Sequence, residues 1–309
     1  MMKGFKTYRI AYLNAILLVG ASVVQFAAAD DAVESAVNAA TKAATAQKYQ
    51  LKYKFRAGDE IRIKVVQLVS MNTRIQGTEE SVRSRSEAIK YLKVRSVDGQ
   101  GNIALDHQVE RANMWQKISG QEEVRYDSTS DNPVPEQYEA LNERIGKPLT
   151  TVLITPSGQM LERKDHIFTY NPGIGLLLPP LPEGDVSIGH KWYMPDQTKV
   201  RLQSGKVKTI QLRKHYSLEK VENGLATIKQ RTEILTPITD AKVKSQVIQR
   251  IQHGYLKFDI QAGRLFNSRL ELDERVIGFN GPTSHIHYLG RLTEQCELVR
   301  DGVQKVSVR

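Results

Sequence analysis

The sequence predicts a mainly β protein, a β-rich α+β chain built from two related antiparallel curved-sheet halves with one or two short helices. Two observations predict this class. From Tyr49 onward, short β-favouring runs alternate apolar and polar side chains and are separated by turns that contain Gly. In addition, Gly-centred landmarks recur in the same order along the two halves of the chain, which indicates an internal duplication.

The first 29 residues are typical of an export signal. Basic residues without an acid precede an apolar stretch, which ends in three alanines before Asp30. Small residues at the −3 and −1 positions favour cleavage between Ala29 and Asp30. The alternative is an uncleaved N-terminal anchor, because the run from Ile10 to Ala29 is just long enough to span a bilayer. We expect export across the inner membrane to the periplasm or cell envelope, with no stable transmembrane span after cleavage.

Charge and cysteine content narrow the class of partner. The formal net charge is +10, and three of these charges lie in the signal, which leaves +7 on the mature chain. This mild excess favours contact with an anionic envelope component but lacks the dense clusters expected of a nucleic-acid binder, so we expect no nucleic acid. The lone Cys296 cannot form an internal disulfide, and we interpret it as a buried structural thiol.

Composition divides the chain into segments. After the signal at residues 1–29, an Ala-rich leader covers residues 30–48. A first β-rich repeat then covers 49–170, a Pro/Gly linker 171–185, and a second β-rich repeat 186–309. We expect the two halves to pack together or to continue into one another, because either one alone would bury little core.

The first repeat begins with an alternating run. Tyr49, Leu51, Tyr53 and Phe55 share one parity, which predicts a strand with one buried face.

The duplication rests on three pairs of similar segments. Phe55–Ile61 corresponds to Val186–Trp192, Tyr91–Arg111 to His215–Arg231, and Val152–Leu161 to Lys257–Phe266. A Gly marks the turn in each, at positions 58, 101 and 158 and again at 189, 224 and 263. We expect each of these glycines to supply a positive φ in its turn.

One helix is predicted over Pro135–Ile145, which has Pro in its first turn and ends at Gly146. The corresponding stretch Asp240–His253 fits either a helix that ends at Gly254 or a strand.

The chain lacks the usual nucleophile-elbow, phosphate-loop, zinc-protease and C-x-x-C motifs, so we expect no catalytic residue and no cofactor. His285 and His287 are the candidate metal ligands, because residues i and i+2 of a strand share a face. The alternative is two surface histidines without a metal.

Two further sets of residues are weaker candidates. Asp165 and His166, with His107 and His190 elsewhere, offer acid–base groups, although neighbouring strand residues face opposite ways. The loop at residues 126–131 offers oxygen ligands suited to Ca²⁺, or is simply a polar loop.

The stretch Lys199–Lys214 predicts a basic hairpin. We expect Lys199, Arg201, Lys206 and Lys208 on its outer face, with a change of parity near Thr209. Such a face either contacts anionic lipid or polysaccharide or prevents edge-to-edge pairing.

Leu141–Leu149 leading into Ile154–Gly158, together with Leu178–Trp192, gives a family resemblance. These segments resemble an uncharacterised family of exported, duplicated β-rich bacterial proteins of planctomycete-type genomes. The resemblance covers most of the mature chain and implies export and a β-rich fold. The family has no established activity, so no site residue is transferred from it.

Three functional hypotheses follow. The first is a non-enzymatic envelope protein that acts as a binding or scaffolding module. The second is a periplasmic carrier of an apolar ligand such as a lipid, since a curved sheet can enclose a cavity that Leu176–Leu178 or Tyr288 and Leu289 would line. The third is a hydrolase built on dispersed His and Asp residues.

Overall fold

The computed structural model describes residues 47–166 and 178–299. The predicted signal, its cleavage site Ala29/Asp30, nearly all of the Ala-rich leader and residues 171–177 of the linker lie outside the described residues.

The first half contributes the strands that form one side of a large sheet. They are β2 (Glu60–Ile75), β3 (Thr78–Val97), β4 (Ile103–Ile118), β5 (Val124–Asp127), β6 (Pro148–Ile154) and β7 (Met160–Asp165), with helix α2 (Glu136–Asn142) before β6. Strand β1 (Tyr49–Gln50) instead pairs antiparallel with Asp185–Val186 in a separate two-stranded sheet.

The second half has a similar order of strands. They are β8 (Asp185–Val186), β9 (Lys191–Arg201), β10 (Val207–Glu222), β11 (Leu225–Ile234), β12 (His253–Asp259), β13 (Arg264–Ile277) and β14 (His285–Val299). Helix α3 (Ala241–Val247) and the 3-10 turn η1 (Ile248–Arg250) precede β12.

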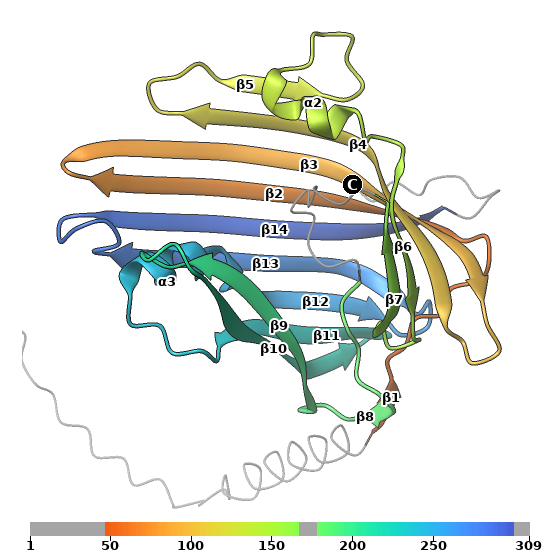
Figure 1. Cartoon of the computed structure of the whole chain (residues 1–309). Coiled ribbons are helices and arrows are strands. Elements are labelled where there is room, and N and C mark those ends of the chain that lie inside the picture. The colour runs from red at the N-terminus through yellow and green to blue at the C-terminus, as the bar shows by residue number, and fades with distance from the viewer. Residues whose placement is uncertain (1–46, 167–177, 300–309) are drawn as a thin grey trace, which may run out of the picture. The chain divides into compact units, whose positions relative to one another are not determined.

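Twelve strands form one antiparallel sheet in the order β7-β6-β4-β3-β2-β14-β13-β12-β11-β10-β9, with β5 added on β4. The first and last long strands, β2 and β14, pair along their whole length and join the two halves. The sheet is not closed, because its edge strands β7 and β9 do not pair with each other. Figure 1 shows the central strands across the back, with β6–β7 and β9–β10 curving forward from the two sides. The predicted mainly β class is confirmed.

Two short α-helices accompany the sheet in the part of the chain that the structure describes. Helix α2 lies within the predicted range and follows Pro135, and it buries Leu141. The open choice at residues 240–253 resolves into a helix, because the Asp240 side chain accepts a hydrogen bond from the Lys242 backbone N–H at 2.8 Å and caps α3. Within residues 47–166 and 178–299, no helix has the length and apolar character needed to cross a membrane.

The six glycines that mark the proposed duplication all have positive φ, as predicted. The angles are 89° at Gly58, 83° at Gly101, 79° at Gly158, 87° at Gly189, 79° at Gly224 and 62° at Gly263. A helix also follows the third long strand in each half, at α2 and at α3. This shared order does not establish a common origin, so the internal duplication stays a prediction.

An extended segment, residues 51–55, crosses the interior of the curved sheet. The alternating burial is as predicted, with Leu51, Tyr53 and Phe55 buried. The predicted strand is wrong beyond Gln50, however, because the backbone bonds go to two separate hairpin turns rather than to one neighbouring strand. The Tyr53 N–H donates to Pro156 O at 2.7 Å, and the Lys54 N–H donates to Gly263 O at 3.0 Å.

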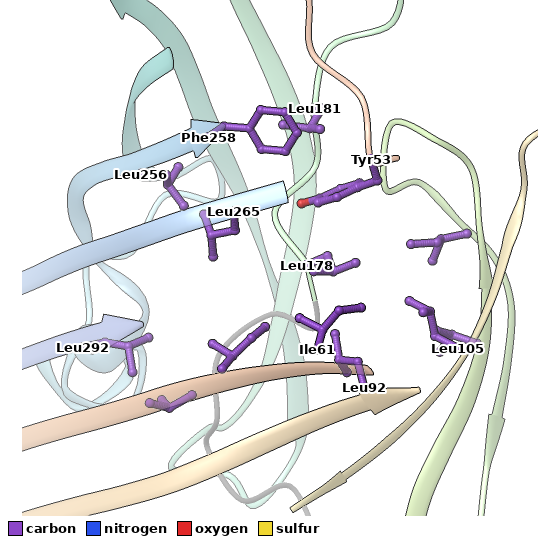
Figure 2. Close-up of a cluster of buried hydrophobic side chains, with 14 of the residues drawn as sticks. Tyr53, Ile61, Leu92, Leu105, Leu178, Leu181, Leu256, Phe258, Leu265 and Leu292 are labelled. Atoms are coloured by element: carbon purple, nitrogen blue, oxygen red, sulfur yellow. The ribbon is translucent and has the colours of Figure 1, made fainter. Parts of the chain in front are cut away.

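A second segment, residues 178–181, crosses beside the first. The Leu181 N–H donates to Ser157 O at 2.8 Å, and the Tyr53 hydroxyl donates to Pro179 O at 2.7 Å. Leu178 is buried in the main apolar cluster, whereas the other leucines of its run lie outside the described residues. Figure 2 shows Tyr53 and Leu178 between leucines of β12–β13 and apolar residues of β2–β4. The two segments therefore fill one end of the interior.

We predict that Gly263→Ala destabilises the protein more than Gly224→Ala. Both positions have positive φ, which costs an alanine about 1 kcal/mol. A Cβ at Gly263 would also lie 2.4 Å from the Lys54 side chain, whereas one at Gly224 would meet nothing within 4 Å. We therefore expect about 2 kcal/mol of additional loss for Gly263→Ala in urea unfolding. Equal losses would show that the crossing segment does not pack on this turn.

Candidate functional site

The interior of the sheet that the crossing segments leave open contains a pocket of about 470 Å³. Strands β12–β14 supply one wall and β9–β11 supply another. The end of α3 and η1 border it with Gln246, Gln249 and Arg250, and Pro179 of the second crossing segment closes one side.

The wall from β12–β14 is largely apolar. Its buried apolar residues are Leu256, Leu270, Leu272, Leu292 and Tyr288. Gly290 lies among them, paired with Leu272 across the ladder. A Cβ at Gly290 would contact the Tyr288 ring at 3.3 Å and Leu272 at 3.6 Å. The absence of a side chain at this one position therefore keeps space open over the leucines.

The wall from β9–β11 is polar. The Lys214 ammonium and the Asp196 carboxylate lie 3.4 Å apart, both less than one third exposed. Lys214 pairs in register with Thr232, and Tyr216 pairs with Gln230. These four side chains share one face of β10 and β11, because alternate residues of a strand point the same way.

Two hydroxyls on this face of β10 and β11, from residues outside the pocket lining, are buried without a partner among the described residues. They are Tyr216 Oη and Thr232 Oγ1, and Tyr216 is only 1% exposed. Burial, and then the charge of Asp196, raises the pKa of Tyr216, so its hydroxyl stays protonated. A buried hydroxyl without a partner is costly, and it is usually satisfied by water or a ligand.

A buried ion pair lies beside the pocket. Lys90 Nζ is 3.0 Å from Glu294 Oε1, and the Ser268 hydroxyl donates to Glu294 Oε2 at 2.9 Å. Lys90 is 1% exposed and Glu294 is 7% exposed, and Glu294 also lines the pocket. The pair bridges β3 and β14, strands on either side of β2.

The histidines proposed as metal ligands lie on the outer face of β14. Ile286 and Tyr288 pack in an apolar cluster on the inner face, so His285 and His287 face the other way. His287 Nε2 is 2.8 Å from Asp273 Oδ1. Within the described part of the chain, no group of three His, Cys, Asp or Glu side chains is placed to hold a metal ion.

The basic hairpin forms, but its expected outer face is partly wrong. Lys199 pairs with Thr209 and Arg201 with Val207, whereas Lys208 pairs with Val200, whose side chain is buried. Lys208 therefore lies on the face opposite to Lys199 and Arg201. Lys206 lies in the turn.

The expected change of parity in the hairpin strand is also misplaced. There is no irregularity near Thr209, and the register of β10 shifts only between Leu218 and Lys220.

The remaining acid–base candidates do not converge. Asp165 pairs with Arg163 at 2.7 Å instead of orienting His166. The Thr151 hydroxyl donates to Asp106, so His166 Nε2, at 2.9 Å, must donate to Thr151 and cannot act as its base.

The other two histidine candidates lie in different surroundings. His190 stacks on Trp192. Burial, followed by the charges of Lys90 and Arg163, lowers the pKa of His107 to about 3, so this imidazole is neutral at physiological pH.

The loop at residues 126–131 satisfies its own carboxylate. Asp127 accepts hydrogen bonds from the Thr129 N–H and hydroxyl and from the Asn113 amide. These bonds lower the pKa of Asp127, with the Thr129 side chain as the largest cause. The geometry is that of a polar turn. Cys296 is half-buried against the main apolar cluster, less enclosed than expected.

Sequence reasoning offered a cavity lined by Tyr288 as one alternative but missed the polar side of the pocket. The signal for that side was the presence of polar residues at inward-facing strand positions, such as Lys90, Lys214, Gln230 and Glu294. These residues look like ordinary surface residues until the partner strands are known.

Comparisons with known proteins do not identify the chain. No protein family model matches the sequence, and no curated protein matches it. The translocator domain of the autotransporter NalP from Neisseria meningitidis is similar over 89% of this chain and 99% of that chain, with 9% identity and a TM-score of 0.30.

Two further solved structures show weaker similarity. DynF from the dynemicin biosynthesis pathway of Micromonospora chersina covers 84% of this chain and 88% of its own, with 6% identity and a TM-score of 0.21. A DUF1329 family protein from Desulfovibrio piger is similar over 80% of this chain and 88% of that protein's chain, with 9% identity and a TM-score of 0.13. Because all these TM-scores lie below 0.5, the three structures carry no argument about this chain.

The buried ion pair yields a prediction for stability. We expect Lys90→Met to cost about 3–5 kcal/mol, because it leaves Glu294 charged and buried. The double variant Lys90→Met/Glu294→Gln should lose at least about 2 kcal/mol less than the sum of the single variants in urea unfolding.

The exposed ion pair Lys220–Glu222, whose charged atoms lie 2.8 Å apart, is the control for this double-mutant cycle. Its coupling should stay below about 1 kcal/mol. Similar coupling in both cycles would contradict the burial of Lys90 and Glu294.

His107 yields a prediction for pH dependence. In the unfolded chain its pKa returns to about 6.5, so between that pH and about 3 the unfolded state binds one more proton. The contribution of the neutral His107 to the free energy of unfolding is therefore complete above about pH 6.5 and is lost as the pH falls toward 3. His107→Gln should reduce the slope of stability against pH in this window by up to about 1.4 kcal/mol per pH unit, measured by urea unfolding. An unchanged slope would contradict the burial of this imidazole.

Proposed function

We propose that the chain is exported and acts in the cell envelope as a non-enzymatic binding module, with its ligand site in the pocket of the curved sheet. One observation carries the proposal, namely that a pocket of about 470 Å³ combines a leucine wall with a wall of charged and polar side chains. Binding sites for small molecules are usually concave, largely preformed, and lined by apolar side chains with a few well-placed polar groups.

The polar side chains of the lining support an occupant with a polar group. Thr198, Lys214 and Gln230 line the pocket from β9, β10 and β11 and carry groups that can form hydrogen bonds. A bound ligand, or water between ligand and wall, can bond to them.

A carrier of an apolar ligand such as a lipid is the second candidate, favoured by the leucine wall. It is weaker because the crossing segments fill the apolar end of the interior with Tyr53, Phe55, Leu178 and their neighbours. The space that is left has Asp196, Lys214 and several Gln side chains in its lining. Of the two residues expected to line an apolar cavity, Tyr288 does line the pocket, whereas Leu289 is 37% exposed on the other face.

A hydrolase receives less support. None of the described histidines lines this pocket, and two of its carboxylates, Asp196 and Glu294, are each held by a lysine.

Export and an envelope location rest on residues 1–29 and on the resemblance of the turns to exported β-rich proteins. Contact of Lys199 and Arg201 with an anionic envelope component stays part of the same proposal. Both are exposed on the outer face of the edge strand β9.

Native mass spectrometry of the protein isolated from its own envelope fraction tests the proposal. We expect a bound small molecule, released on denaturation, on the wild-type chain. Gly290→Val should lack it, because a branched side chain at this position fills the space over Leu272 without needing a positive φ.

The matched control is Ser70→Val. Ser70 pairs with Leu289, whose side chain is exposed, so the substitution adds a similar group on the opposite face of the sheet. This variant should keep the bound mass. A wild-type protein without any bound mass, or a mass that Gly290→Val retains, would contradict the proposed site.

A further inference from the structure

The charged side chains that line the pocket form ion pairs, with one exception. Each of its carboxylates has a basic partner: Asp196 has Lys214 at 3.4 Å, Glu271 has Arg291 at 3.0 Å, and Glu294 has Lys90 at 3.0 Å. Arg250, in contrast, makes no ion pair with an acid in residues 47–166 and 178–299. Among the bases that line the pocket, Arg250 is therefore the one whose charge is not paired with an acid of the described residues.

Arg250 is held at the border of the pocket by a short, anchored element. It ends η1, directly after α3. The Gln246 side chain of α3 bonds both the Arg201 N–H at 2.9 Å and the Arg201 carbonyl at 2.8 Å, which ties the helix to the end of β9. The Arg250 side chain itself is exposed, so its guanidinium is available to a ligand.

The opposite wall suits a hydrocarbon group. Leu256, Leu270, Leu272 and Leu292 line it over three neighbouring strands, and Gly290 leaves room above them. Contact with this wall removes apolar ligand surface from water, which favours binding by about 25 cal/mol for each Å².

We infer that the ligand is a small amphipathic anion, a carboxylate with a single hydrocarbon group. Its acid group binds the Arg250 guanidinium, which matches a carboxylate with two parallel N–H donors. Its hydrocarbon lies on the leucine wall. The inference rests on the proposed function and adds to it the chemical class and the orientation of the ligand.

Calorimetric titration of the mature protein with three probes of equal chain length tests the class. The probes are sodium octanoate, octyl glucoside and octyltrimethylammonium, each below its critical micelle concentration. Octanoate should bind with one-to-one stoichiometry and at least about tenfold more tightly than the neutral or cationic probe, since only the anion can pair with Arg250.

Variants locate the head group. Arg250→Gln should weaken octanoate binding about tenfold and leave octyl glucoside unaffected. Arg231→Gln removes the same charge from an exposed position outside the pocket lining and should change neither. Gly290→Val should abolish binding of octanoate in the pocket.

Failure of the proposed ligand class and failure of the proposed site give different results. If the three probes bind equally and Gly290→Val abolishes all of them, the anionic class is wrong and the proposed pocket stands. If octanoate binds and neither Arg250→Gln nor Gly290→Val alters it, the inference and the proposed site both fail. If no probe binds, the inference is overturned, and the mass-spectrometry result alone decides the proposed function.

A lipid surface is a separate source of the same chemistry. We expect that Arg250→Gln does not change the amount of protein that sediments with phosphatidylglycerol vesicles. If Arg250→Gln abolishes such sedimentation while octanoate does not bind, Arg250 contacts a membrane surface and the inference is overturned.

Discussion

The packing of residues 51–55 across the interior of the sheet is the interaction on which the rest of the structure depends. A curved sheet whose edges β7 and β9 do not pair must bury its apolar inner face against something else. Tyr53 provides that contact. Its ring stacks on Phe55 with 5.4 Å between the ring centroids, and it packs edge-on against Phe258 with 5.6 Å between the centroids. Its hydroxyl holds the second crossing segment at Pro179. The two halves of the sheet thus share one core.

The same arrangement explains why a pocket exists and why it is polar. The crossing segments cover only one end of the interior, and the helix α3 with its own apolar cluster covers another part. Between them, the inner faces of β9–β14 have no covering segment among the described residues, and there the inward positions carry Lys214, Gln230 and Glu294. Polar groups are tolerated inside a protein where they are paired or wetted, and a ligand can replace the water.

Several features of this fold could be read from the sequence because they are local. Gly158 and Gly263 each lie between two runs of alternating residues, and a turn is needed there to join the two strands. The alternation of Leu51, Tyr53 and Phe55 with polar residues correctly predicted that these three side chains are buried. The pairing of β2 with β14 could not be read, since periodicity shows that a residue is inward but not which strand lies beside it. For the same reason the sequence did not indicate that Lys90 pairs with the distant Glu294, and the polar side of the pocket could not be predicted.

The parity error at Lys208 has a similar cause. The turn at residues 202–206 sets the register of the β9–β10 hairpin, and that register is visible only in the paired strands. A run of basic residues therefore indicated an exposed hairpin but not which side each charge occupies.

Native-state hydrogen exchange of the backbone amides of Tyr53 and Lys54 tests most directly whether the crossing segment belongs to the common core. The account predicts that both amides, bonded to Pro156 O and Gly263 O, open with the same free energy as amides of the central strand β2, to within about 1 kcal/mol. If these two amides open with a free energy lower than that of the β2 amides by about 3 kcal/mol or more, the segment detaches while the sheet stays folded. That result would contradict the claim that it holds the two halves and the pocket walls together.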